Sequence, residues 1–148
     1  MLNTKSSEVS GSWQPVGVDM AKVRILVIED QDEARTMMKQ MLTEIGVNQI
    51  FEASDGREGM GFLDMAEDMV DIVLCDWNMP SMSGLELLKQ LQSVGCELPF
   101  VMITGRGDRN SVFQAKGAGV DGYILKPFSL VQLEAKLRIV CTRHGIGE

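Results

Sequence analysis

Five polar residues are placed to carry out phosphoryl chemistry, because each follows closely on an apolar run of the sequence. Glu29 and Asp30 follow one run, Asp76 follows another, and Thr104 and Lys126 follow two more. Three carboxylates brought together repel one another unless a cation joins them, and Mg²⁺ is the usual such cation in phosphoryl chemistry. A carboxylate can attack a phosphoryl group to form an aspartyl phosphate, while a metal ion and an ammonium group neutralise the transferring oxygens. The residue types therefore indicate a Mg²⁺-assisted phosphoryl acceptor.

The elements that must position these residues are five short apolar strands separated by amphipathic helices. The strands are predicted over residues 23–28, 49–53, 71–75, 100–103 and 122–125. The helices are predicted to end at Gly46, to cover 57–67, 83–93 and 108–116, and to begin at Ser129. Ser83 with Glu86, and Ser129 with Gln132, have the spacing of capping boxes. In the first helix we expect Met37, Met38 and Met41 to fill the core.

Strict alternation of apolar strands with helices predicts a mainly parallel sheet with right-handed crossovers, in a three-layer α/β/α sandwich. Ligands bind such sheets beyond the carboxyl ends of the strands. The intervals between Asp30, Asp76, Thr104 and Lys126 hold two, one and one helix-strand crossovers. All of these side chains can therefore reach the same rim of the sheet.

Length and composition describe one domain of ordinary globular type. The chain has 148 residues, and its 14 Lys and Arg against 21 Asp and Glu give a net charge of −7. This charge disfavours binding to nucleic acid or anionic lipid. No apolar run approaches the ~20 residues of a membrane span, and no secretion signal is evident, so we expect a cytoplasmic protein. Three cysteines without CxxC spacing are expected to be reduced and packed, and residues 1–20 are expected to be a flexible tail.

Several local motifs resemble those of the receiver domain of two-component response regulators. They are Glu29-Asp30, Asp76-Trp77-Asn78-Met79-Pro80, Ser83-Gly84, Thr104-Gly105 and Gly122-Tyr123-Ile124-Leu125-Lys126-Pro127-Phe128. The resemblance covers roughly residues 22–143, which predicts a receiver domain at residues 21–145, and it is strongest to the stand-alone chemotaxis receivers of the CheY type. It implies a flavodoxin-like, doubly wound sheet of order 2-1-3-4-5.

The resemblance also implies a role for each residue of the acidic rim. Asp76 would accept a phosphoryl group from a sensor histidine kinase. Asp30, Asp76 and the backbone carbonyl of Asn78 would bind Mg²⁺, and Glu29 would assist through water. Receivers commonly carry Asp where Glu29 stands, which should reposition this outer ligand. Beyond its own phosphorylation and dephosphorylation, the protein is not expected to be an enzyme.

The remaining implied roles concern the phosphoryl group and the response to it. Thr104 would hydrogen-bond a phosphoryl oxygen, Lys126 would pair with the group, and Tyr123 would change rotamer. Arg106 is close enough in sequence to reach toward the phosphoryl group and alter its hydrolysis. The peptide bond between Lys126 and Pro127 is expected to be cis.

The predicted output surface is the face formed by the fourth helix, fifth strand and fifth helix. Its residues match the receiver surface that binds the flagellar motor switch, namely Arg109, Val112, Lys116, Tyr123 and Lys136. The leading hypothesis is a monomeric, phosphorylation-controlled receiver acting on a downstream protein, with the motor switch favoured. Three alternative functions remain: a phosphorelay shuttle, an adaptor for a kinase or second-messenger enzyme, and a receiver that acts constitutively.

A small Mg²⁺-dependent phosphatase is the alternative from another class. Against it, the residue two positions after Asp76 is Asn78, which breaks the Asp-x-Asp pair that such enzymes use. The sequence also lacks a glycine-rich phosphate loop.

Overall fold

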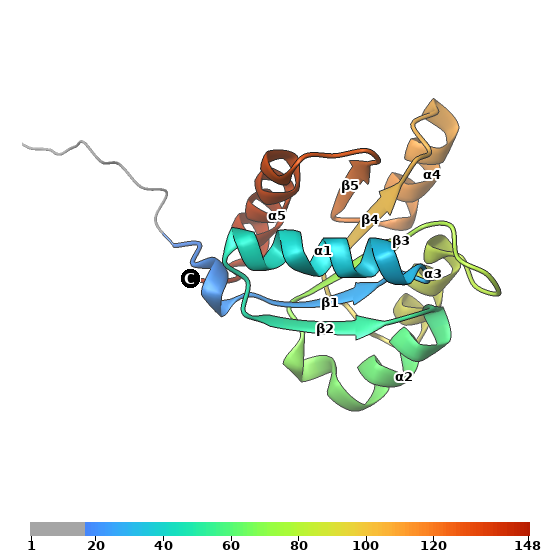
Figure 1. Ribbon diagram of the computed structural model, residues 1–148. Coiled ribbons are helices and arrows are strands. Elements are labelled where there is room, and N and C mark those ends of the chain that lie inside the picture. The colour runs from blue at the N-terminus through green and yellow to red at the C-terminus, as the bar shows by residue number, and fades with distance from the viewer. Residues whose placement is uncertain (1–16) are drawn as a thin grey trace, which may run out of the picture.

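The computed structural model describes residues 17–148, and these residues form the predicted α/β/α sandwich (Figure 1). The predicted tail up to residue 16, with Trp13, lies outside the described residues. In chain order the elements are η1 (Met20–Lys22), β1 (Arg24–Ile28), α1 (Asp32–Ile45), β2 (Gln49–Ala53), α2 (Gly56–Ala66), η2 (Glu67–Met69), β3 (Ile72–Asp76), α3 (Gly84–Ser93), β4 (Phe100–Thr104), α4 (Arg109–Ala118), β5 (Gly122–Leu125) and α5 (Leu130–His144).

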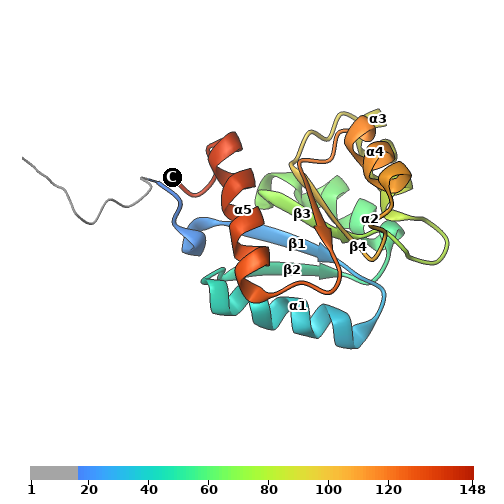
Figure 2. The same ribbon diagram turned by 90° about the horizontal axis from the view of Figure 1, so that it is seen from above.

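The five strands form one parallel sheet in the order β2-β1-β3-β4-β5, which confirms the predicted 2-1-3-4-5 topology. Figure 2 shows α1 on one side of this sheet and α2, α3 and α4 on the other. Helix α5 packs with α1, since Leu133 and Leu137 belong to the same buried cluster as Leu42. The two faces of the sheet therefore have separate cores.

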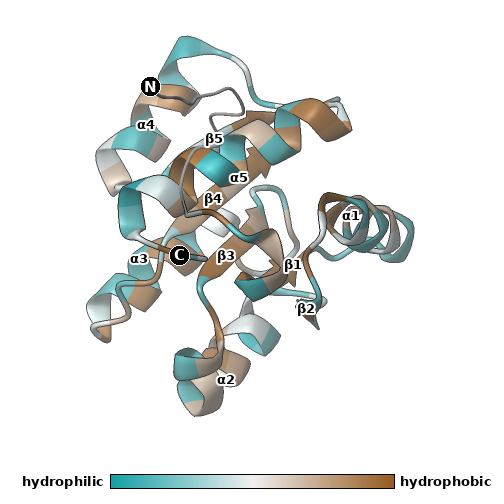
Figure 3. Ribbon diagram, turned by 90° about the vertical axis from the view of Figure 1, so that its left-hand side faces the viewer, coloured by the Kyte–Doolittle hydropathy of each residue, from teal (hydrophilic) through white to brown (hydrophobic). Residues whose placement is uncertain are grey.

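Alternation of side chains along β1 explains why the sheet needs helices on both faces. Ile25 and Val27 belong to the cluster under α1 and α5, whereas Leu26 and Ile28 belong to the cluster under α2 and α3. Successive residues of a strand point to opposite faces, so an apolar run with no polar positions must be covered twice. Figure 3 shows the consequence, with hydrophobic strands inside and hydrophilic segments on the outer helices.

Local sequence signals set most of the helix ends. Both capping boxes are confirmed: Ser83 and Glu86 bond reciprocally at the start of α3, and Ser129 and Gln132 do so at the start of α5. Helix α1 ends at Gly46, which adopts the left-handed conformation with φ of 113°. Glycine adopts this conformation at low cost, which is why the helix stops there.

Two details of the helix prediction are wrong. Helix α4 does not end at Gly117 but continues to Ala118, and Gly119 caps it with φ of 97°. Met37 does not fill the core, because 61% of its surface is exposed, while the adjacent Met38 is 7% exposed. Neighbouring helix positions differ by about 100° in direction, so one of two adjacent methionines faces solvent.

The packed domain begins before β1. The backbone N–H of Asp19 donates to the carbonyl of Gly147 at 2.8 Å. Met20 is buried and joins the core under α1 and α5, where Val18 packs against it. Residues 18–20, which the sequence pattern placed in the tail, thus lie against the carboxyl-terminal end of the chain. None of the helices between residues 17 and 148 is long and apolar enough to cross a membrane.

Candidate functional site

Three acids meet at the carboxyl ends of β1 and β3. Glu29 and Asp30 follow β1, and Asp76 is the last residue of β3. The two strands are adjacent, with Ile28 paired to Cys75, so the acids come to the same level of the sheet. One carboxylate oxygen from each of the three lies within 4.8 Å of the others. Glu29 and Asp76 are each only 7% exposed, and Asp30 is partly exposed, so the cluster is largely shielded from solvent; we call these three acids the acidic pocket.

Lys126 supplies a positive charge to this acidic pocket. It follows β5, two strands away from β3, and its Nζ lies 3.0 Å from Oδ1 of Asp76 and 3.5 Å from Oε1 of Glu29. The peptide bond between Lys126 and Pro127 is cis. One ammonium group thus contacts two of three carboxylates, and the pocket keeps an excess of negative charge.

Burial raises the pKa of Glu29, and the charge of Asp76 adds to the effect. Burial also raises the pKa of Asp76, although the hydrogen bond and charge of Lys126 oppose the shift. For Lys126, burial lowers the pKa, but the combined contribution of Asp76 and Glu29 is larger and leaves it raised. The pocket therefore lacks positive charge, and its donors are hard oxygens, which suits a divalent cation such as Mg²⁺.

Replacing Asp76 with Asn should increase stability at neutral pH without Mg²⁺. A raised pKa means that ionising Asp76 costs the folded state more free energy than the unfolded state. Wild type therefore loses stability as the pH rises from about 3.9, the ordinary Asp value, through the raised pKa of Asp76. Asp76→Asn has no such titration. Urea unfolding over a pH series should show the free-energy difference growing through this window and levelling off above it, and a difference that stays constant across the window would contradict the expectation.

Residue 106 connects the other predicted site residues. Its backbone N–H donates to Oγ1 of Thr104 at 3.0 Å, and its carbonyl accepts from the hydroxyl of Tyr123 at 2.6 Å. Its guanidinium donates to Oδ1 of Asn78 at 2.9 Å and lies 4.7 Å from the centre of the Trp77 ring. The guanidinium of Arg106, from the β4–α4 loop, thus packs against Trp77 and Asn78, the two residues that follow the predicted acceptor Asp76.

Arg106→Ala should expose Trp77 and weaken the β4–α4 loop. Trp77 is 3% exposed, and the guanidinium lies over its ring, so the substitution should shift the fluorescence of Trp77 to longer wavelength. Loss of the cation–π contact and one hydrogen bond should reduce the free energy of unfolding by about 1 kcal/mol. Arg109→Ala is the control, since Arg109 is exposed on α4. An unchanged Trp77 spectrum in Arg106→Ala would contradict this reading.

The predicted output residues lie around β5, at the edge of the sheet between α4 and α5 (Figure 1). Arg109 and Lys116 are exposed, whereas Val112, Tyr123 and Lys136 are partly buried. The same elements also carry exposed apolar residues that were not predicted from the sequence, namely Phe113, Leu125, Val131 and Ile139. Phe113 is 74% exposed. The sequence did contain a signal for this patch: Phe113 is a large aromatic residue next to the predicted contact residue Val112.

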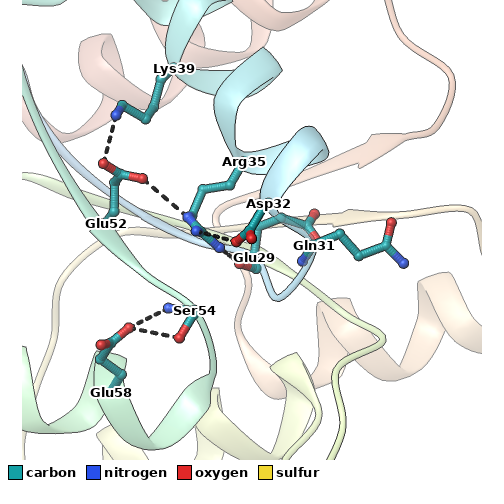
Figure 4. Close-up of polar contacts among 8 residues, drawn as sticks. All are labelled: Glu29, Gln31, Asp32, Arg35, Lys39, Glu52, Ser54 and Glu58. Atoms are coloured by element: carbon teal, nitrogen blue, oxygen red, sulfur yellow. Dashed lines mark hydrogen bonds and ion pairs between the residues drawn. The ribbon is translucent and has the colours of Figure 1, made fainter.

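Arg35 is a second residue that the sequence analysis missed. Figure 4 shows its side chain reaching from α1 toward the turn after β1, between Asp32 and Glu52. Its Nη1 donates to the backbone carbonyl of Glu29 at 2.8 Å. The sequence contained a signal for its role, because Arg35 is a cation in the first turn of a helix. The helix dipole disfavours positive charge there unless nearby acids neutralise that charge.

Comparison with known proteins identifies the family. The model of the response regulator receiver domain matches residues 25–138. The chain is 38% identical to chemotaxis protein CheY-3 of Vibrio cholerae over 117 residues, which are 78% of this chain and 88% of that relative. It is also 38% identical to a chemotaxis protein CheY homolog of Campylobacter jejuni over 128 residues, which are 84% of this chain and 98% of the relative.

Solved structures agree with the sequence comparison. A response regulator receiver domain protein from Clostridium thermocellum superposes with a TM-score of 0.76 at 26% identity, covering 82% of this chain and 96% of that one. Chemotaxis protein CheY4 of Vibrio cholerae gives a TM-score of 0.71 at 30% identity, covering 81% and 99%. With its 2-1-3-4-5 sheet, its acidic pocket and the matched residues 25–138, the chain belongs to the response regulator receiver domain family.

Proposed function

We propose that this protein is a response regulator whose receiver domain takes a phosphoryl group on Asp76 from the phosphohistidine of a sensor histidine kinase. The observation that carries the proposal is the contact of Asp76 with Lys126 at 3.0 Å inside a pocket shared with Glu29 and Asp30. This arrangement pairs one nucleophilic carboxylate with groups that can bind a cation. It lies at the carboxyl rim of the sheet, where a second protein can reach it.

In the proposed reaction an oxygen of Asp76 attacks phosphorus, and the bond from phosphorus to the histidine nitrogen breaks. The imidazole leaves with the bonding electrons and takes up a proton. Lys126, already 3.0 Å from Asp76, neutralises part of the charge on the transferring oxygens. Asp30, Asp76 and the backbone carbonyl of Asn78 would hold Mg²⁺, with Glu29 as an outer ligand, and the ion would neutralise further phosphoryl charge.

The response would pass from Thr104 to Tyr123 through residue 106. The Thr104 hydroxyl accepts the N–H of Arg106, so its own proton is available for a phosphoryl oxygen. The hydroxyl of Tyr123 donates a hydrogen bond to the backbone carbonyl of Arg106. A movement of Thr104 toward the phosphoryl group would therefore shift the backbone that holds Tyr123.

The output surface would be the α4–β5–α5 face, with Arg109, Val112, Lys116, Tyr123 and Lys136 as contact residues and the exposed Phe113 among them. The flagellar motor switch is the favoured target, because the curated relatives are chemotaxis proteins. The protein would act in the cytoplasm as a monomer. A phosphorelay shuttle or an adaptor for another enzyme would use the same phosphoryl acceptor, Asp76. These two alternatives differ from a motor-switch regulator only in the protein that binds the α4–β5–α5 face.

Incubation with acetyl phosphate and Mg²⁺, followed by intact-mass measurement, tests the proposal. The mass should rise by one phosphoryl group, and chelation of the metal should prevent the rise. A constitutive receiver would stay unmodified. A small phosphatase would instead hydrolyse a generic phosphate ester through many turnovers. Capture of partners with and without beryllium fluoride, a phosphoryl mimic, would separate the motor switch from the shuttle and adaptor outputs.

A further inference from the structure

Arg35 contacts the backbone of the turn that carries two of the pocket acids. Its Nη1 donates to the carbonyl oxygen of Glu29 at 2.8 Å, which is a main-chain contact rather than an ion pair. The same side chain is only 16% exposed, and its other nitrogens are bonded to Asp32 at 2.6 Å and to Glu52 at 3.1 Å. The guanidinium therefore joins three separate elements: the turn, the first turn of α1, and β2.

The two acids hold the guanidinium fork in one orientation. Glu52 itself is fixed, because its second oxygen pairs with Lys39 at 2.6 Å (Figure 4). An arginine has several donors in a rigid plane, so it can serve two carboxylates and a carbonyl together, whereas a lysine ammonium cannot copy this geometry. The Glu29 carbonyl is thus hydrogen-bonded to a guanidinium that two acids also hold, the exposed Asp32 and the less exposed Glu52.

The turn after β1 needs such support because it bears like charges. Glu29 and Asp30 lie within 4.8 Å of Asp76, and repulsion among the three acids favours opening of the turn. Two further contacts hold it: the N–H of Glu29 donates to the Ala53 carbonyl at 3.1 Å, and the Glu29 side chain accepts the N–H of Gln31 at 3.2 Å. Among these contacts, only that of Arg35 fixes the Glu29 carbonyl.

We propose that Arg35 is a positioning residue that sets the affinity of the acidic pocket for Mg²⁺ by fixing the turn at Glu29 and Asp30. The inference rests on the proposed function, which places Mg²⁺ in this pocket. Partners that orient metal ligands typically change metal affinity by about 10- to 100-fold when they are removed.

The charge of Arg35 and its positioning role predict opposite changes in Mg²⁺ affinity when Arg35 is removed, so an experiment can distinguish them. A guanidinium close to the pocket repels a divalent cation, so its removal would strengthen Mg²⁺ binding if Arg35 acted only through its charge. If Arg35 acts by positioning, its removal weakens binding. Arg35→Met keeps the apolar stem and removes the guanidinium, and Arg35→Lys keeps the charge and removes the fork.

The test measures Mg²⁺ affinity through the fluorescence of Trp77, in a Trp13→Phe background so that Trp77 is the only tryptophan. Arg35→Met and Arg35→Lys should both bind Mg²⁺ about tenfold more weakly than the parent. Labelling by acetyl phosphate should need correspondingly more Mg²⁺ for half-saturation, but should reach the parent rate when Mg²⁺ is saturating. A purely structural loss would lower the rate at all Mg²⁺ concentrations.

Two variants of the same ion-pair ladder complete the experiment. Glu52→Gln leaves Arg35 in place but loosens it, so it should show an intermediate loss of affinity even if Arg35→Met fails to fold. Lys39→Gln removes the contact that steadies Glu52 but leaves every contact of Arg35, so it should weaken Mg²⁺ binding less than Glu52→Gln does, by about twofold at most.

Unchanged or tighter Mg²⁺ binding in Arg35→Met, or parent affinity in Arg35→Lys, would overturn the inference while leaving the proposed function intact. A parent protein that binds no Mg²⁺ and takes up no phosphoryl group would instead refute the proposed function, so the two failures can be told apart.

Discussion

Asp76→Asn should remain folded and should take up no phosphoryl group from acetyl phosphate in the presence of Mg²⁺. The amide that replaces the carboxylate has nearly the same shape but is a poor nucleophile toward phosphorus, and it removes one proposed oxygen ligand of the cation. The Oδ1 atom of Asp76 is 3.0 Å from Lys126, so the substitution also removes the acid that faces the ammonium group. Intact-mass spectrometry should show complete loss of labelling.

Two other acids serve as controls for this experiment. Asp64→Asn changes an exposed acid of α2 outside the acidic pocket, and it should be labelled as wild type is. Asp30→Asn keeps the nucleophile but removes a cation ligand, so it should be labelled more slowly and should need more Mg²⁺. Equal labelling of wild type and Asp76→Asn would remove Asp76 from the proposed role.

Gly84→Ala should destabilise the protein strongly and disturb the acceptor as well. A Cβ at this buried position would lie 2.5 Å from the backbone carbonyl oxygen of Asp76 and 2.8 Å from Sδ of Met102. The carbonyl cannot move away freely, because it belongs to the last residue of β3. Overpacking of this kind costs about 1–3 kcal/mol. The shifted acceptor should also label more slowly in the acetyl phosphate assay.

Gly61→Ala provides the matched control, since Gly61 also lies inside a helix but has open space around the added Cβ. Alanine is the better helix former, so this substitution should increase the free energy of unfolding by about 0.5–1 kcal/mol. Urea denaturation of the two variants should therefore give changes of opposite sign. Destabilisation of similar size in both would show that contact with the Asp76 backbone is not the cause.

The acidic pocket was predictable in part because its residues are tied to strand ends. Glu29, Asp30 and Asp76 each follow or end an apolar run. Parallel strands bring their carboxyl ends to one rim of the sheet, independently of how the connecting helices pack. Lys126 reaches Asp76 although 50 residues separate them in sequence. The resemblance to receiver domains predicted that Lys126 pairs with the phosphoryl group, which places it near Asp76, and strand spacing alone does not specify that position.

Long side chains with several partners within reach were not predictable in the same way. The sequence indicated that Arg106 is close enough to reach toward the phosphoryl group, but not that its guanidinium lies against Trp77 and Asn78. The contact of Arg35 with the Glu29 carbonyl depends on where β2 places Glu52. Rotamer choice in such residues follows from acids and rings that come close only after the chain has folded.

The amino-acid sequence by itself determined the order of strands and helices, both capping boxes and the set of acids at the rim. These features depend on hydrophobic periodicity and on hydrogen bonds between residues a few positions apart. Only the tertiary structure decided that Met38 rather than Met37 is buried and that α4 passes Gly117 to end at Gly119. Met38 packs in the core under α1 and α5, and the carbonyl of Ala118 accepts a hydrogen bond from the side chain of Gln92 in α3 at 2.7 Å. Both are contacts with distant parts of the chain, which no local pattern contains.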